Sequence, residues 1–207
     1  MKHAASRELY AYWDAQRGTR PAPERVEIEP GAIRSALGDT FILSLDPAAT
    51  GIVRLAGTRI CALLGREIKG ESFLDLWAEP NRSTMEGLLS ILSDECTGTV
   101  AGASAENDNG DAVELELLLL PLSIRRPIFA RAIGVLAPLK IPAWLGTSPV
   151  GPASLGGRRH IGAAIEKRLR PRFMAPGFMA PWGRRGLLVY DGGRSLPVQE
   201  EDGPTAA

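Results

Sequence analysis

The residues from Arg54 to Trp77 place two short helical segments directly after a strand, and this order constrains the fold more than any other stretch. Thr58 can cap the first helix, and Gly65 ends it because glycine adopts the left-handed conformation that closes a helix. Ser72 and Asp75 have the spacing of a capping box, which predicts a second helical turn ending near Trp77. The chain must therefore pack short helices against the strands on either side of this connector.

Two compact apolar runs precede the connector and are predicted strands. The first covers residues 39–45 and the second residues 52–55, and Asp46, Pro47 and Gly51 mark a turn between them. Strands joined by so short a connection must be antiparallel. The connector therefore leaves the second strand of a hairpin.

After the connector, the apolar residues change from a helical period to a strand period. Residues 81–94 are a predicted helix with one apolar stripe, which is expected to face a sheet. The stripe consists of Met85, Leu88, Leu89 and Leu92. Strands are predicted at 97–105, 113–123 and 128–137. The sequence Asn107-Asp108-Asn109-Gly110 predicts a tight hairpin turn between the first two, because Asn-Gly tolerates the positive φ angles of such turns.

Residues 5–17 are predicted to form an amphipathic helix that ends at Gly18. Leu9, Tyr12 and Trp13 lie on one face of this helix and are the candidate interface residues. Two arrangements are open, in which the helix packs on its own domain or pairs with a second subunit. We expect protein partners, including a homodimer formed through this helix or through a face of the sheet.

The composition changes from residue 140 onward. Residues 140–207 hold 8 of the 16 prolines and 11 of the 23 glycines, which argues against a second packed core. They carry 10 basic and 5 acidic residues, a net charge of +5, whereas residues 1–139 carry 14 and 19, a net charge of −5. We divide the chain into an N-terminal helix and linker (1–29), a domain (30–139) and a largely disordered basic tail (140–207).

Within the tail, three segments have some structural signal. A short helix is predicted over Arg158–Leu169, and Leu187–Tyr190 suits a strand or a docking segment. Residues 173–181 repeat Phe-Met-Ala-Pro, which suits a peptide that docks on a surface.

The order of the predicted elements resembles that of a PAS domain. The sequence GTRICALLGREIKGESFLDLW has the layout of the PAS connector, with a short helix, a glycine-marked loop and a buried apolar helix. Together with RELYAYWDAQRG and DTFILSL, it is similar to a small bacterial PAS family typical of alphaproteobacteria, once catalogued as a domain of unknown function. The resemblance covers roughly residues 5–139. It implies an α+β fold, a five-stranded antiparallel sheet with helices packed on one face, and a stand-alone sensory domain.

In PAS domains a small ligand, where there is one, lies between the helices and the sheet. The candidate ligand-binding residues are therefore Arg54, Thr58, Arg59, Trp77, Met85, Leu88 and Leu89. Small residues in the strand at 97–105 would leave room for a cavity, whereas the leucines at 115–120 are large enough to fill it. Both an open and a closed core are consistent with the sequence.

Arg54 and Arg59 also allow two interpretations. Two guanidinium groups at the mouth of a cavity would hold a carboxylate or phosphate through paired hydrogen bonds. Alternatively, they pair with acidic side chains of nearby loops, such as Glu67, Glu71 or Asp75. We favour the second interpretation.

The sequence argues against catalysis and against metal chemistry. The two histidines, His3 and His160, lie outside the predicted domain, so the commonest base and metal ligand is missing from it. Haem PAS domains usually bind iron through a histidine of the long helix, and residues 81–94 contain none. Cys61 lacks the polar motif of light-sensing flavin PAS domains, so no flavin–thiol chemistry is expected. The identity of any other cofactor stays open.

The expected function is a sensory or regulatory signalling module that acts through protein–protein contacts, with gating by a small ligand as an option. The alternative is a ligand-free adaptor or dimerisation domain. An enzyme or a nucleic-acid binder ranks lowest, because the basic segment 158–172 has few interleaved aromatic residues. No apolar run of about eighteen residues is present, so no transmembrane segment is expected, and we expect a cytoplasmic protein.

Overall fold

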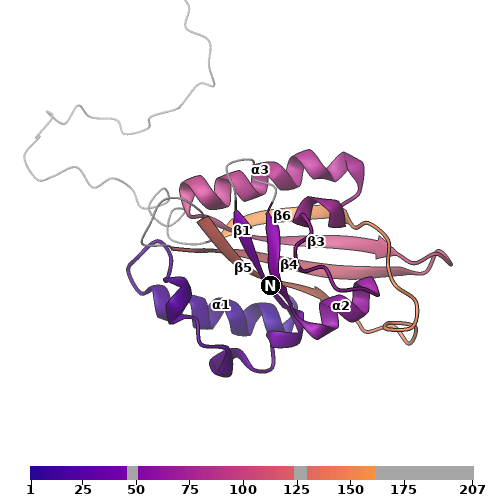
Figure 1. The fold of residues 1–207 in the computed structure, drawn as a ribbon, viewed down its shortest axis with the longest axis horizontal. Helices are drawn as coiled ribbons and strands as arrows, with labels where there is room; N and C mark the ends of the chain where they lie inside the picture. The colour runs from indigo at the N-terminus through magenta and orange to yellow at the C-terminus, as the bar shows by residue number, and fades with distance from the viewer. Residues whose placement is uncertain (46–50, 124–129, 162–207) are drawn as a thin grey trace, which may run out of the picture. The chain divides into compact units, whose positions relative to one another are not determined.

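The computed structural model describes residues 1–45, 51–123 and 130–161. In these ranges the chain forms one sheet with helices packed against it (Figure 1). The helices are α1 (Ala4–Arg17), η1 (Arg25–Glu27), η2 (Pro30–Ile33), η3 (Leu37–Asp39), α2 (Thr58–Leu64), η4 (Phe73–Leu76) and α3 (Glu79–Glu95), where η marks a 3₁₀ helix. The strands are β1 (Thr40–Leu45), β2 (Ile52–Ala56), β3 (Gly98–Glu106), β4 (Ala112–Leu122), β5 (Ala130–Pro138) and β6 (Ser154–Ile161).

Neighbouring strands of the sheet are all antiparallel, in the order β2-β1-β5-β4-β3-β6. The predicted hairpin between β3 and β4 is confirmed. Oδ1 of Asn107 accepts hydrogen bonds from the backbone N–H groups of Asn109 (3.0 Å) and Asp111 (2.9 Å). Gly110 has a positive φ of 82°, as the turn requires. The predicted α+β class with an antiparallel, PAS-like sheet is thereby confirmed.

One face of the sheet, the inner face, is covered by α3 (Figure 1), and buried residues of α2 and η4 belong to the same core. The apolar stripe predicted for α3 is confirmed, because its four members are buried in the core that α3 shares with the sheet. Gly134 of β5 allows close packing on this face, since a Cβ atom there would lie only 2.4 Å from Cζ of Phe41. The helices after β2 therefore pack on one face, as predicted.

On the opposite, outer face, α1 covers the sheet together with the η1–η3 segment, and a second core lies beneath them (Figure 1). Leu9 and Trp13 of α1 are 0% exposed. The indole N–H of Trp13 donates a hydrogen bond of 2.8 Å to the carbonyl of Pro121 in β4. Of the two arrangements open for the N-terminal helix, the structure has the one in which it packs on its own domain.

Strand β4 shows why the sheet needs cover on both faces. Leu117 and Leu119 lie in the inner core, whereas Leu118 and Leu120 lie in the outer core. A strand with large apolar residues on both faces must be buried on both. The resemblance predicts helices on one face of the sheet, and in the structure α1 covers the other face as well.

The sheet has a sixth strand that the sequence prediction of five strands did not include. β6 pairs with β3, and residues 149–153, the strap, lead into it. Residues 140–161 therefore belong to the described fold rather than to a disordered tail. A helix was predicted from Arg158 onward, but the structure has a strand there up to Ile161. Glycines and arginines interrupt the apolar alternation of β6, so backbone pairing with β3 is its main support. The predictions for 162–169, 173–181 and 187–190 lie outside the described residues.

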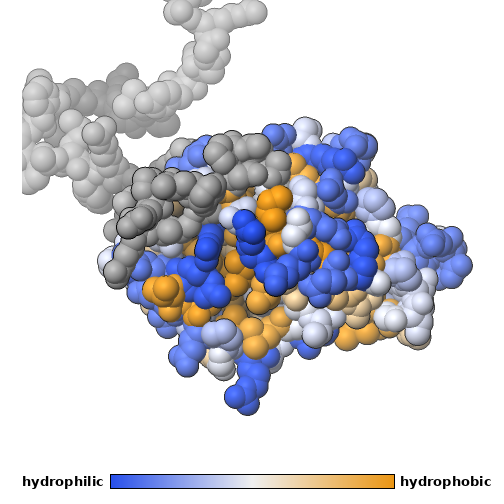
Figure 2. Space-filling view, viewed as in Figure 1, coloured by the Kyte–Doolittle hydropathy of each residue, from blue (hydrophilic) through white to orange (hydrophobic). Residues whose placement is uncertain are grey.

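The described helices include none that is long and apolar enough to cross a membrane. On the face shown in Figure 2, apolar surface appears as separate patches among hydrophilic side chains. Three large apolar side chains of the described ranges are strongly exposed: Val26 (82%), Leu55 (44%) and Ile141 (75%). Exposed apolar residues carry functional meaning chiefly where they adjoin a groove.

Candidate functional site

The apolar residues predicted to line a ligand site do lie together, in the inner core. Trp77, Met85 and Leu89 are 0% exposed and Leu88 is 3% exposed. Leucines of β4 and alanines of β3 belong to the same cluster. These side chains pack together in an apolar core with almost no solvent exposure, which favours the closed alternative of the two that the sequence allowed.

Trp77 brings a hydrogen-bond donor into this apolar core. Its ring meets Phe73 edge-on at a centroid distance of 5.9 Å, and Phe73 stacks on Phe41 at 5.0 Å. Nε1 of Trp77 is buried and has no hydrogen-bond partner among the described residues. A buried donor without an acceptor costs about 1–3 kcal/mol. This N–H is therefore a point in the inner core suited to receive an acceptor atom.

The strap closes the inner core on the side of the connector. The backbone N–H of Val150 donates to the carbonyl of Leu63 at 3.0 Å, and that of Ala153 donates to the carbonyl of Leu76 at 2.9 Å. Ala153 also pairs with Trp77 in a parallel bridge. The strap thus ties α2 to η4 and runs alongside the residue that carries the unpaired N–H.

An apolar groove of about 340 Å³, the edge groove, opens on the outer side of β1 and β2. A β-bulge shapes it, because Ile42 pairs with Leu55 while Leu43 pairs with Val53, which leaves Arg54 as the extra residue. Val53 lies in the inner core, whereas Leu55 forms a wall of the edge groove. The bulge therefore lets one short strand serve both faces of the sheet.

The polar residues predicted to line a ligand site, Arg54, Thr58 and Arg59, are exposed and lie outside the inner core; Thr58 lines the edge groove. Nε and Nη2 of Arg59 donate to the two carboxylate oxygens of Asp39 at 2.9 and 2.7 Å. Nη2 also donates to the carbonyl of Ser35 at 2.7 Å. The hydrogen bond to Asp39 raises the pKa of Arg59. Arg59 is thus paired with an acid, although with Asp39 rather than with the loop carboxylates considered from the sequence.

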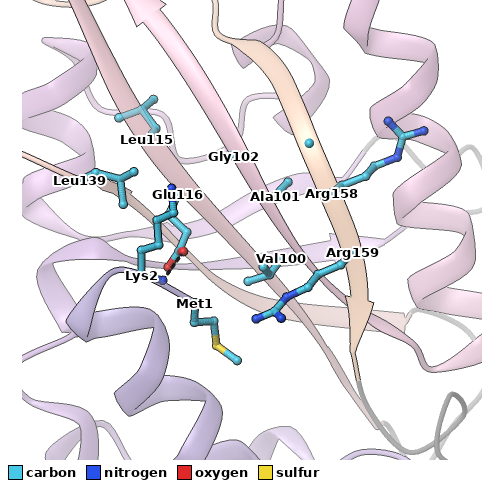
Figure 3. Close-up of a pocket in the computed structure, with 11 residues that line it drawn as sticks. Met1, Lys2, Val100, Ala101, Gly102, Leu115, Glu116, Leu139, Arg158 and Arg159 are labelled. Atoms are coloured by element: carbon cyan, nitrogen blue, oxygen red, sulfur yellow. Dashed lines mark hydrogen bonds between the residues drawn. The ribbon is translucent and has the colours of Figure 1, made fainter.

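A larger groove of about 640 Å³, the outer groove, lies on the outer face between the first residues of the chain and β6 (Figure 3). Val100 and Gly102 of β3 contribute to its lining. In Figure 3, Lys2 and Glu116 lie together on one side, and Arg159 extends from β6 on the other. The outer groove therefore combines an apolar floor with charged groups on both sides.

Glu116, on β4, holds the start of α1 against the sheet. The backbone N–H groups of Lys2 (2.5 Å) and His3 (3.0 Å) donate to its carboxylate. Burial would raise the pKa of Glu116, but these donors and the Ser6 hydroxyl outweigh that effect, and the pKa is lowered. The sequence prediction assigned no role to Glu116. The signal for such a role was an acidic residue among the leucines at 115–120.

The described parts of the chain contain no group of His, Cys, Asp or Glu side chains that could hold a metal ion. Nδ1 of His3 accepts a hydrogen bond of 3.2 Å from the N–H of Ala5 and so caps α1. Nδ1 of His160 lies 3.1 Å from the hydroxyl of Thr99 and joins β6 to β3. Both histidines therefore have structural roles.

Several solved structures are similar to this chain. One is the PAS domain of an HTR-like protein from Haloarcula marismortui, with 22% identity over 55% of this chain and 94% of that one, and a TM-score of 0.38. A second is an RNA-binding light-oxygen-voltage receptor, with 16% identity over 57% of this chain and 33% of that one, and a TM-score of 0.39. A third is the PAS domain of a protein from Colwellia psychrerythraea, with 13% identity over 53% of this chain and 97% of that one, and a TM-score of 0.37. None of the curated proteins matches the chain.

The family comparison covers most of the described fold. A family model described as a PAS domain matches residues 1–137, from α1 through nearly all of β5. The strap and β6 follow the matched region. On the strength of this match, the chain belongs to the PAS domain family.

Proposed function

We propose that this chain is a sensory and regulatory signalling module that acts through protein–protein contacts. The observation that supports it is the contrast between the inner core, in which Trp77, Met85, Leu88 and Leu89 are at most 3% exposed, and grooves that open on the surface. Partners reach the surface directly, whereas the core admits nothing without rearrangement. A partner that binds one arrangement of helices and sheet better than another shifts the population toward it.

The proposed homodimer uses a face or edge of the sheet rather than α1. Leu9 and Trp13 are buried in their own chain, and the Tyr12 hydroxyl is hydrogen-bonded to the segment that follows α1. Leu55, by contrast, is exposed on the edge strand β2 and walls the edge groove. Apolar surface beside a groove is the kind of surface that association buries.

Sedimentation velocity over a range of protein concentrations tests this contact. We expect a dimer that forms with rising concentration and that Leu55→Glu weakens, because a charge would have to be buried in the contact. Ile141→Glu is the control for a different surface, since Ile141 is even more exposed and lines a separate groove beside Ser35 and Leu145 rather than the edge groove. A wild-type chain that stays monomeric, or an equal loss in both variants, would contradict the proposed contact.

Gating by a small ligand is a second candidate function, and the unpaired N–H of Trp77 favours it. The fitting ligand is a small, mainly apolar molecule with one hydrogen-bond acceptor, and the strap would have to move to admit it. Native mass spectrometry of protein purified from its own host tests this candidate. A retained molecule that Trp77→Phe releases supports gating, whereas a ligand-free wild-type protein supports the adaptor function.

The proposed role is regulatory and includes no catalytic step, in keeping with the family. Cys61 and Cys96 are free thiols. Free cysteines are usual in reducing compartments, which supports our proposal of a cytoplasmic location. Activity against a panel of generic hydrolase and transferase substrates would count against a purely regulatory role.

A further inference from the structure

The outer edge of β6 is open in the described structure. β6 is the last strand in the order of the sheet, and no described strand pairs with its far side. Its residues, Ser154–Ile161, are exposed or half-buried along their whole length. The backbone N–H of Leu155 donates to Oδ1 of Asn81 at 3.1 Å. Beyond Leu155, an edge strand of this kind presents backbone N–H and C=O groups that can accept another strand.

Two adjacent arginines of β6 project to opposite faces of the sheet. Arg159 pairs with Val100, which lies in the outer core, and Arg158 pairs with Ala101, which lies in the inner core. Paired residues of neighbouring strands share a face. Figure 3 shows the same divergence, with Arg159 directed toward Met1 and Arg158 directed away from it. Neither arginine forms a salt bridge with any described residue.

The outer groove continues the positive surface from Arg159. Lys2 stands across the groove, and the carboxylate of Glu116 is already engaged by backbone N–H groups at the start of α1. Gly102 and Gly157 contribute backbone to the lining without side chains that would block it. A segment lying beside β6 would therefore meet one arginine on each face, with open space on the outer face.

From these observations we propose that β6 is the docking edge for an extended acidic peptide of a partner protein, which joins the sheet as a further strand. Backbone hydrogen bonds along the edge supply affinity. Arg158 and Arg159 select two consecutive acidic residues, because consecutive side chains of a strand point to opposite faces. The acidic side chain opposite Arg159 lies at the outer groove, on the side of the sheet where Lys2 stands.

The docking edge rests on the proposed function, because it names an acidic peptide as one partner of a module that works through protein contacts. The edge groove and β6 lie at opposite edges of the sheet. Failure of the homodimer test therefore leaves peptide docking intact, and failure of peptide docking leaves the homodimer intact.

Three synthetic peptides, each of about eight residues rich in valine and threonine, test the docking edge with the full-length protein. The first carries two consecutive glutamates at its centre. The second is an isomer with its glutamates two positions apart, so that both point to one face. The third is the first peptide with alternate backbone nitrogens methylated, which prevents strand pairing. Fluorescence anisotropy at low salt gives each Kd, and we expect the first peptide to bind about tenfold or more tightly than the other two.

Matched variants separate the docking edge from general charge attraction. The double variant Arg158→Ala/Arg159→Ala is expected to weaken binding of the first peptide about tenfold or more. Arg54→Ala is the control, because Arg54 is an exposed arginine on β2 at the opposite edge of the sheet, and it should leave the Kd unchanged. Thermal unfolding verifies that both variants fold.

Three results would overturn the proposal. Equal affinity for the two isomers, or no effect of backbone methylation, would show that charge alone attracts the peptides and that no strand is added. Absence of binding by all three peptides would leave the arginines with the sole role of protecting an exposed edge from aggregation.

Discussion

Trp13 and Trp77 form a matched pair that tests the unpaired donor in the inner core. Both side chains are 0% exposed. The N–H of Trp13 donates to the Pro121 carbonyl at 2.8 Å, whereas the N–H of Trp77 has no partner among the described residues. Replacing each by phenylalanine keeps an aromatic ring and removes the N–H. The two variants therefore share the cost of a smaller ring and differ chiefly in the hydrogen bond. Trp13→Phe also weakens the contact with the Arg17 guanidinium, which lies 5.3 Å from the centre of the Trp13 ring.

The hydrogen bond sets a lower estimate of the difference in stability between these variants, because the Arg17 contact adds to the cost of Trp13→Phe. Trp13→Phe loses a satisfied hydrogen bond, which adds about 0.5–1.5 kcal/mol to the cost of the smaller ring. Trp77→Phe removes a buried donor that has no acceptor. This change stabilises the fold by about 1–3 kcal/mol and offsets part of the cost of the smaller ring. We therefore expect Trp13→Phe to be more destabilising than Trp77→Phe by about 1.5–4.5 kcal/mol, or a difference in Tm of roughly 3–18 °C.

Urea unfolding followed by circular dichroism measures this difference without relying on tryptophan fluorescence. Equal m values for the two variants would show that the comparison concerns stability alone. If Trp77→Phe is as destabilising as Trp13→Phe, the N–H of Trp77 has an acceptor in solution and the reasoning from an unpaired donor is refuted. Native mass spectrometry of the same sample would then distinguish a bound ligand from water.

Three further predictions concern the contacts that hold the fold together. Glu116→Gln is expected to lower the free energy of unfolding by about 1–2 kcal/mol at neutral pH. Folding lowers the pKa of Glu116, so its contribution to stability is present above the ordinary pKa of 4.5 and is lost as the pH falls through the pKa of the folded state. The unfolding free energies of wild type and variant should therefore converge in acid. Arg59→Ala leaves Asp39, 3% exposed, without its charged partner and is expected to cost about 2–3 kcal/mol in urea unfolding. Arg59→Lys is expected to recover only part of this stability, because the ammonium group lacks the planar pair of N–H donors that matches a carboxylate. A chain ending at Leu139 lacks the strap and β6 and is expected to be about 2–4 kcal/mol less stable than one ending at Ile161; equal stability would show that the strap does not hold the core.

The helices and the hairpin could be predicted because their signals are local. The bounds of α2 agree with the prediction, although Gly57 rather than Thr58 is the N-cap residue. Ser72 caps η4 as expected, by accepting a hydrogen bond from the N–H of Leu74 at 3.2 Å. Caps, glycine stops and apolar periods act within a few residues, so the sequence around each element carries the information.

The placement of α1 and the addition of β6 could not be predicted, because both depend on residues far apart in the chain. Glu116 and Pro121 hold α1 from more than 100 residues away. β6 shows no apolar alternation, since its stability comes from backbone pairing with β3. The apolar residues of the candidate site were identified correctly as neighbours, but side-chain volume and packing, which sequence does not give, decide that they form a closed core.

The connector from β2 to η4 is where the inner core, the edge groove and the strap meet. Its bulge directs Val53 into the inner core and Leu55 to the edge groove, and its helices supply the carbonyls that hold the strap. Elements that share one short segment cannot rearrange independently, because interiors are close-packed. A change at Trp77 that displaced the strap would therefore alter the packing of α2 and the wall of the edge groove together.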